Sequence, residues 1–223
     1  MPKFRDLLER GGKTTFKPDK KHGTLHRQSL SQLTKRTLGS GNLRAAVECP
    51  TDDDLNDWLA ANTVDFFNEI SLLYGLVVDD AAQYTQPGEG FPPSFEYRWG
   101  ESNTKKPIRV SSPEYVDYVM TWVEDQLDNE AIFPTLEEED FPDDFLDYIK
   151  DIFKRLFRVY AIIYHRHFHV FEELDAQAHL NTCFKHFIFF CIRYELITDE
   201  KELAVLDGPI KHLKEEYDEQ GDE

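Results

Sequence analysis

Apolar residues recur at helical spacing through most of the chain beyond residue 40. The first long run follows Thr51-Asp-Asp-Asp54 and ends at Gly75. Its apolar positions are Leu55, Trp58, Leu59, Phe66, Ile70 and Leu73. Thr51 is expected to cap this helix, because a hydroxyl accepts hydrogen bonds from the free N–H groups of a first turn and the carboxylates that follow suit the helix dipole. Asn62 and Asp65 are a candidate break within it.

Capping signals and periodicity predict four more helices. Ser112-Pro-Glu114 places a proline in a first turn, which is a common helix start. The next helix, roughly 144–174, is long and apolar on much of its circumference, so we expect it to be central in the fold. Two more helices are expected at about 176–194 and 200–213.

Two stretches depart from helical spacing. Phe95–Trp99 and Ile108–Val110 are short alternating runs joined by a loop that contains Gly and Asn, a pattern that predicts a β-hairpin. Residues 77–93 contain three prolines and two glycines and are expected to form a loop. The sequence as a whole predicts an all-α fold, a helical bundle with one small β-hairpin.

Composition divides the chain into three parts. Residues 1–40 are polar and basic with little apolar periodicity, which predicts a flexible N-terminal arm. Residues 41–213 carry the helical pattern of one large domain, and the 17 Phe, 10 Tyr and 3 Trp of the chain can fill a sizeable core. Residues 214–223 are a charged tail that we expect to fray.

The chain has no stretch typical of secretion or membrane insertion. Its longest apolar run, Phe187–Ile192, is far shorter than the about 20 residues that a bilayer requires. Three scattered cysteines, Cys49, Cys183 and Cys191, do not make a disulfide framework or a thiolate metal site. We therefore expect a soluble, cytoplasmic protein without membrane insertion.

The two signs of charge are separated along the chain. Residues 1–40 hold ten of the 25 Lys and Arg and three of the 43 Asp and Glu. The remaining 183 residues therefore hold fifteen basic and forty acidic side chains, a balance of −25. Such a surface repels phosphate, which argues against a nucleic-acid partner and favours a basic one.

The stretch between Val110 and Ile149 has thirteen carboxylates and neither Lys nor Arg. A solvated surface that keeps the protein soluble is one interpretation. A docking surface for a basic segment is the other, since complementary charge speeds association and selects the partner. The stretch alone does not decide between them.

Basic residues follow at once on the next expected helix. Lys154 and Arg158 lie at positions i and i+4 of one stripe that begins at Lys150, and Arg155 is beside them. Guanidinium groups bind phosphate oxygens in a bidentate way, so the cluster is a candidate anion site. The alternative is that these cations pair with neighbouring carboxylates.

Three histidines at alternate positions, His165, His167 and His169, suggest a metal site. On an α-helix His165 and His169 share a face and His167 points elsewhere, and no thiolate or carboxylate has ligand spacing, so surface or core histidines are the simpler interpretation. The sequence has no Gly-x-Ser-x-Gly, no phosphate-binding glycine loop and no His-Glu-x-x-His. Catalytic signals are therefore weak.

The segments that carry a family resemblance are Thr37–Arg44, Asp57-Trp58, Asn62–Asn68, Leu73–Gly75, Phe95–Tyr97, Tyr118–Val123, Lys154–Tyr160, His179–Thr182 and Lys185–Phe190. Taken together, these segments make the sequence resemble the class-one branch of the Mob (Mps one binder) family. They cover roughly residues 14–213 in order. The resemblance implies a Mob-type helical bundle that acts as a non-catalytic adaptor and activates NDR/LATS-type kinases in Hippo or mitotic-exit signalling and cytokinesis.

The resemblance also implies two binding sites. In the family an acidic face receives a basic helical segment that precedes the kinase domain. The matching positions are Asp53, Asp57, Trp58, Asp65 and His186. A separate basic pocket accepts phosphothreonine peptides of an upstream Ste20-like kinase or scaffold, and its matching positions are Lys154, Arg155, Arg158, Lys105 and Lys106. Two phosphorylated threonines of the arm correspond to Thr15 and Thr37.

The sequence departs from the family at its structural zinc, which two cysteines and two histidines usually hold. Aligned without gaps, the cysteine positions are Ala81 and Gln86, and the first histidine position is Ile162. Only His167 matches. One ligand cannot hold a structural zinc, so we expect no metal and no cofactor, and a less firmly held loop at residues 77–93.

Two other functions stay open. One is a metal-dependent hydrolase that uses the acidic residues and the histidines. The other is a divergent Mob scaffold that activates no kinase. The resemblance favours the kinase adaptor, with the nucleus and the spindle pole or centrosome as further locations beside the cytoplasm.

Overall fold

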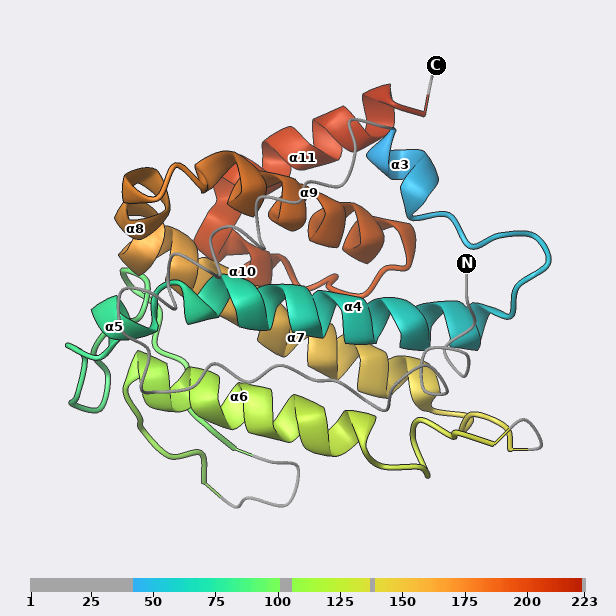
Figure 1. The fold of residues 1–223 in the computed structure, drawn as a ribbon, viewed down its shortest axis with the longest axis horizontal. Coiled ribbons are helices and arrows are strands. Elements are labelled where there is room, and N and C mark those ends of the chain that lie inside the picture. The colour runs from blue at the N-terminus through green and yellow to red at the C-terminus, as the bar shows by residue number, and fades with distance from the viewer. Residues whose placement is uncertain (1–41, 101–105, 137–138, 222–223) are drawn as a thin grey trace.

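The computed structural model describes residues 42–100, 106–136 and 139–221, and these form an all-α arrangement, as predicted. The helices are α3 (Leu43–Ala46), α4 (Leu55–Gly75), α5 (Val78–Ala81), α6 (Ser112–Leu127), α7 (Phe145–Ile162), α8 (Phe168–Glu173), α9 (Gln177–Arg193), α10 (Glu200–Leu203) and α11 (Asp207–Glu219). In Figure 1, α4 and α7 cross the middle of the molecule, with α6 on one side and α9 and α11 on the other. Within the described residues no helix combines the length and apolar composition that a bilayer crossing requires.

The two ends of the described chain meet. Arg44 of α3 donates from Nη1 to the carbonyl of Tyr217 at 2.6 Å, and its guanidinium lies over the ring of Tyr217. Helix α11 continues to Glu219, past residue 213, where we expected the last helix to end. The buried Tyr217 holds these extra residues against the rest of the protein. The expected arm at 1–40, with Thr15 and Thr37, lies outside the described residues, and so does Lys105.

Side-chain caps set the starts of α4 and α6. Asp54, not Thr51 as we expected, caps α4, because its carboxylate accepts from the backbone N–H groups of Asn56 and Asp57. The expected break at Asn62 is also wrong, since Asn62 donates to the carbonyl of Trp58 at 2.8 Å and α4 continues to Gly75. The predicted start of α6 is confirmed by a capping box that links Ser111 and Glu114.

Helix α7 is the centre of the core, as predicted. Phe153 stacks on Phe187 and Phe190 of α9, with ring centroids 5.2 and 5.5 Å apart, and Phe66 of α4 contacts all three rings. The expected single helix at 144–174 is divided by a π-helical turn, Ile163–His167, which precedes α8. One extra residue in this turn changes the face on which the following side chains lie.

The region before α6 is more ordered than we expected of a loop. It contains α5 and is tied to the start of α6 by hydrogen bonds from Gly88 N to Val110 O and from Ser112 N to Glu89 O. Gly90 has a φ of +78°, and a Cβ there would lie 2.0 Å from the Ser112 hydroxyl. The predicted hairpin is reduced in the described residues to one antiparallel bridge between Trp99 and Ile108. The pattern of alternation was too short to sustain a ladder.

Candidate functional site

The predicted acidic face follows α4. Asp53 precedes the helix, Asp57 lies in its first turn, and Asp65 lies two turns later, about 12 Å along the axis from Asp57. The imidazole of His186 on α9 packs against Phe66 with ring centroids 4.9 Å apart, so α4 and α9 meet beside Asp65. Asp65 is exposed, and Asp53, Asp57 and His186 are half-buried, so all four side chains reach the surface.

Trp58 does not belong to the exposed part of that face. Its side chain is 5% exposed and joins the core under the N-terminal half of α4. A large buried aromatic at this position fixes the helix that carries the acidic residues. Trp58 therefore acts on the face mainly through the placement of Asp57.

Burial changes the charge state of this surface. Desolvation lowers the pKa of His186 to about 4, so its imidazole is neutral near pH 7. Desolvation also raises the pKa of Asp65. One turn further along α4, burial raises the pKa of Glu69 to about 7. A hydrogen bond with the Cys183 thiol opposes this shift, and the charge of Asp65 adds to it. The face is thus negative at its rim and partly neutral where α4 meets α9.

The predicted anion site on α7 contains an internal carboxylate. Arg158 donates from Nε and Nη2 to the two oxygens of Glu202 at 2.6 and 2.7 Å, and from Nη1 to the Tyr115 hydroxyl at 3.1 Å. Glu202 comes from α10, and its side chain is 9% exposed. Burial disfavours the guanidinium charge, but the bonds to Glu202 and Tyr115 outweigh it and raise the pKa of Arg158.

The other cations of the cluster surround the same pair. The ammonium of Lys154 lies 3.8 Å from Glu202 and its side chain is 42% exposed. Arg155 lies over the rings of Trp99 and Trp122, at 4.7 and 4.4 Å, and donates to the carbonyl of Gly100. Lys106 is exposed on the segment that leads into Ile108, next to Trp99. Lys154, Arg155 and Arg158 are therefore brought together. Lys154 and Arg158 do pair with a carboxylate, but Glu202 is distant in the sequence and not one of the neighbours that the alternative named.

The three histidines are distributed by the π-helical turn. His165 pairs through Nε2 with the carbonyl of Val205 at 2.8 Å. His167 is fully buried and its Nδ1 lies 2.7 Å from Asp80 of α5, while the exposed His169 lies 3.5 Å from the other oxygen of Asp80. Burial lowers the pKa of His167, although Asp80 opposes this shift. His167 and His169 face the same carboxylate, which the α-helical spacing did not predict.

Comparison with known sequences identifies the family of the chain. The sequence model of the Mob1/phocein family matches residues 35–206. The chain belongs to the Mob1/phocein family. It is 50% identical over 202 residues to MOB kinase activator-like 1 homolog B of Dictyostelium discoideum, which covers 89% of this chain and 93% of the relative. It is also 50% identical over 206 residues to MOB kinase activator-like 1A of Arabidopsis thaliana, over 91% of this chain and 95% of the relative.

The family's zinc ligands do not fit the residues of this Mob protein. Ala81 and Ile162 are buried apolar side chains, and Gln86 is exposed. His167 is the one imidazole left at those positions, and its buried Nε2 has no hydrogen-bond partner within residues 42–100, 106–136 and 139–221. Among the residues that the structure describes, no three His, Cys, Asp or Glu side chains gather where they could share a metal ion. The donor chemistry for zinc, and for a hydrolytic metal, is therefore not assembled at this place.

The sequence analysis missed three functional carboxyls. Glu202 is 44 residues from Arg158, Asp80 is 87 residues from His167, and Glu69 is hidden among the apolar positions of α4. Only Glu69 gave a local signal, because it is a carboxyl on the same α4 stripe as Asp65. The other two pairs depend on how distant helices pack.

Proposed function

We propose that this Mob-family protein is a non-catalytic adaptor that binds and activates an NDR/LATS-type kinase. The relatives described above, which are named as MOB kinase activator-like proteins, support this function. The observation that carries it is the separation of an acidic face on α4 from a basic cluster on α7, within a chain of net charge −18. Two partners of opposite charge can then be held at the same time on one small domain.

The acidic face is suited to a basic helical segment of the kinase. Asp53, Asp57 and Asp65 are spread along α4, and His186 adds no positive charge near pH 7 because its pKa is about 4. Long-range attraction to such a face speeds encounter, and the half-buried imidazole of His186, which packs on the buried Phe66, offers an uncharged contact beside Asp65. The kinase segment would therefore lie along α4 and reach His186 of α9.

The test is charge reversal with a matched control. In the full chain, Asp57→Lys with Asp65→Lys should weaken binding of a synthetic basic kinase segment by about tenfold or more, since each reversal removes an attraction and adds a repulsion. Glu172→Lys with Glu173→Lys makes the same charge change on the exposed end of α8 and should leave binding within about twofold. Equal weakening by both pairs would mean that only total charge matters, and no weakening by the α4 pair would refute the face.

We also propose that the α7 cluster binds phosphothreonine peptides of an upstream Ste20-like kinase or scaffold. A phosphate offers three acceptor oxygens to Lys154, Arg155 and Arg158. Because Glu202 already accepts from Arg158, the phosphate must share or displace this carboxylate. The cations of the pocket are therefore already held in place, but the pocket also contains the negative charge of Glu202.

Calorimetry with a phosphorylated peptide and its unphosphorylated form tests the pocket. Lys154→Ala is the clean variant, because the Lys154 side chain is more exposed than that of Arg158 and its loss leaves the Arg158–Glu202 pair intact. We expect about tenfold weaker binding of the phosphorylated form and no change for the other. A full triple replacement by Ala should abolish the preference. Indistinguishable affinities of the two peptides for the natural chain would refute the pocket.

Kinase activity separates activation from scaffolding. The chain, mixed with an NDR/LATS-type kinase and substrate, should raise the rate of phosphorylation, and the α4 double variant should not. Binding without a rise in rate would identify a divergent Mob scaffold. Purifying the protein from its native cell and identifying the kinase that co-purifies would then show whether the protein acts in Hippo or in mitotic-exit signalling.

A further inference from the structure

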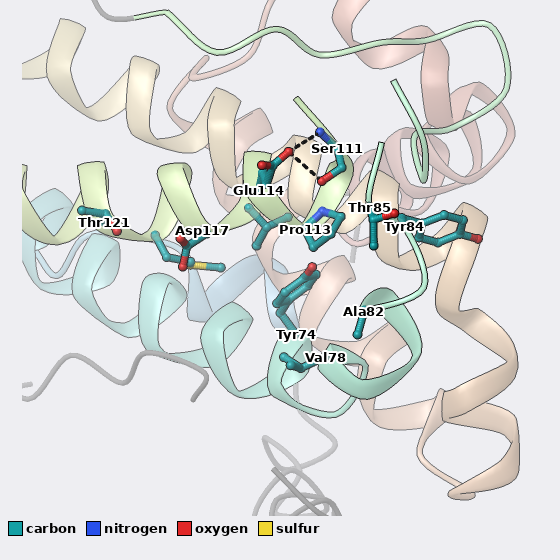
Figure 2. Close-up of a pocket in the computed structure, with 12 residues that line it drawn as sticks. Tyr74, Val78, Ala82, Tyr84, Thr85, Ser111, Pro113, Glu114, Asp117 and Thr121 are labelled. Atoms are coloured by element: carbon teal, nitrogen blue, oxygen red, sulfur yellow. Dashed lines mark hydrogen bonds between the residues drawn. The ribbon is translucent and has the colours of Figure 1, made fainter. Parts of the chain in front are cut away.

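A pocket of about 410 Å³ lies between the end of α4, α5 and the first turns of α6. Figure 2 shows its lining, with Tyr74 and Val78 on one side and Pro113 and Asp117 of α6 on the other. Ala82 lies at one end of the pocket in Figure 2, and Met120 is also among its lining residues. A volume of this size accommodates one or two large apolar side chains, and it falls in the range of real binding pockets.

Tyr74 gives the pocket one unsatisfied polar group. Its side chain is 5% exposed, its hydroxyl has no hydrogen-bond partner among the described residues, and in Figure 2 the hydroxyl points from α4 toward Pro113 across the pocket. Burial raises the pKa of Tyr74, and the charge of Asp117 adds to this shift, so the hydroxyl keeps its proton. Buried hydroxyls in proteins are almost always paired, and an occupant of the pocket can supply the missing partner.

The rim of the pocket carries only negative charge. Glu114 and Asp117 are the charged residues among those that line it. Thr121 lines the far end of the pocket, and the exposed Asp125 and Asp128 continue the acidic row along and just past the end of α6. No Lys or Arg occurs between Val110 and Ile149, so α6 itself contributes no cation to this face.

The pocket is separate from the two proposed sites. On α6, Pro113, Asp117 and Met120 face the pocket, whereas Tyr115 and Trp122 lie on the opposite side and contact Arg158 and Arg155. The acidic face of α4 is centred on its N-terminal half, and the pocket contacts α4 only near Tyr74. An occupant of the pocket would leave both sites accessible.

We propose that this pocket is a third protein-binding site, which takes a short basic peptide segment of a second protein. One large apolar side chain of the segment enters between Val78 and Met120, and a Lys or Arg beside it lies over Asp117. Backbone or side-chain polar groups of the peptide pair with the Tyr74 hydroxyl. The acidic row that continues along α6 favours an extended chain over a compact small molecule, because a peptide can reach several of these carboxylates at once.

The chain offers a direct probe, since Met1 and Met120 are its only methionines. Methyl-labelled methionine in the full-length protein gives one NMR signal from the pocket and one from the N-terminus. The titrant is a ten-residue peptide with one leucine between Lys and Arg residues and Gly-Ser ends. We expect the Met120 methyl signal to shift and saturate, and a peptide with alanine in place of leucine to bind at least tenfold more weakly.

Variants in the pocket test the same geometry. Ala82→Trp and Thr121→Trp each place an indole in the pocket from an exposed position, and either should abolish the Met120 shift. Asp117→Lys should weaken binding at least tenfold. Glu173→Lys, the same charge change on α8, should stay within twofold of the natural chain. Two filling variants are used so that a failure of one to fold does not remove the test.

Several results would overturn the proposal. Peptide binding with an unmoved Met120 signal, or equal binding of the leucine and alanine peptides, would show attraction by charge alone. A Met120 signal that moves on dilution without peptide would identify a second copy of the chain as the occupant. A signal that moves when Lys3, Arg5 and Arg10 are replaced by Glu would identify the chain's own N-terminal segment instead.

Discussion

The acidic face on α4 and the basic cluster on α7 differ in how the protein holds their charge. On α4, Asp65 is exposed and Asp57 is half-buried, and the imidazole of His186 near Asp65 is neutral. On α7, Arg158 is paired with the nearly buried Glu202, and Arg155 is packed between Trp99 and Trp122. One surface projects its charge into solvent, and the other neutralises most of it inside the protein.

Because of this difference, we expect the α4 face to act through long-range attraction and the α7 cluster to act through fixed donor groups at short range. Exposed carboxylates act over roughly a Debye length, about 10 Å at 0.1 M salt, so the α4 face attracts a basic partner before contact. The α7 cluster has little field at a distance, and its strength depends on guanidinium groups fixed in place by Glu202 and the aromatic rings. Binding at the first surface should weaken steeply with salt, and binding at the second should weaken less.

The largest expected effect comes from breaking the internal pair of the basic cluster. Arg158→Ala leaves Glu202 buried with only the more distant Lys154, and we expect a loss of about 3 kcal/mol in the free energy of unfolding. Arg158→Ala with Glu202→Ala should lose less, because no unpaired charge is left. Urea unfolding of both variants measures this. A double variant as unstable as the single one would show that the packing of Arg158 on Tyr97, not its charge, stabilises the site.

The second effect concerns Glu69, where the acidic face meets the core. Its folded-state pKa of about 7 lies above the ordinary value of 4.5, so its contribution to stability is fully present below pH 4.5 and is lost as the pH rises through about 7. Glu69→Gln should therefore stabilise the protein at pH 8 by up to about 3 kcal/mol and leave it unchanged near pH 4. Thermal unfolding across this pH range measures the difference. A constant difference at all pH values would contradict a raised pKa.

The third effect tests whether Glu202 competes with phosphate. Glu202→Gln keeps the shape and one acceptor oxygen but removes the negative charge at Arg158. We expect a phosphothreonine peptide to bind about tenfold more tightly, and Glu200→Gln on the same helix to change nothing. Weaker binding to the Glu202→Gln chain would mean that Glu202 positions Arg158 for the phosphate and does not compete with it.

Local patterns in the sequence were sufficient to predict most of the helices. The start of α6 was correct because the capping box and the proline of its first turn act within four residues. The centre of the fold was correct because α7 carries a broad apolar face with ten buried residues. The start of α4 was wrong by three residues, since Thr51 and Asp54 are equally good caps by type and only the backbone geometry distinguishes them.

The candidate sites were predictable only in part. The positions of Lys154 and Arg158 on one stripe follow from helical spacing, but their partner Glu202 arrives from a helix that follows two intervening helices. The π-helical turn had no signal in the sequence, and it turned His167 into the core beside Asp80. Contacts of this kind depend on tertiary packing, which a spacing rule cannot contain.

The smallest expected effect comes from the second internal pair, Asp80 with His167. It joins α5 to the π-helical turn, at the place where the family resemblance implies a zinc site, and Arg166 adds a bond from Nε to the carbonyl of Phe91 at 2.6 Å. Asp80 is more exposed than Glu202, and burial lowers the pKa of His167 and so favours its neutral form, so this pair should contribute less than the buried one on α7.

Asp80→Ala should lower the free energy of unfolding by about 1 kcal/mol and speed hydrogen exchange across residues 77–93, while Asp79→Ala, an exposed neighbour, should do neither. A chelator should leave the melting temperature of the natural chain unchanged, because a hydrogen bond and not a metal ties the two elements. One equivalent of zinc in the purified protein, with a large drop in melting temperature on chelation, would show that the loop is aligned wrongly with the family. Faster exchange in the Asp79→Ala chain would place the tie in the whole turn of α5, not in the one carboxylate that reaches His167.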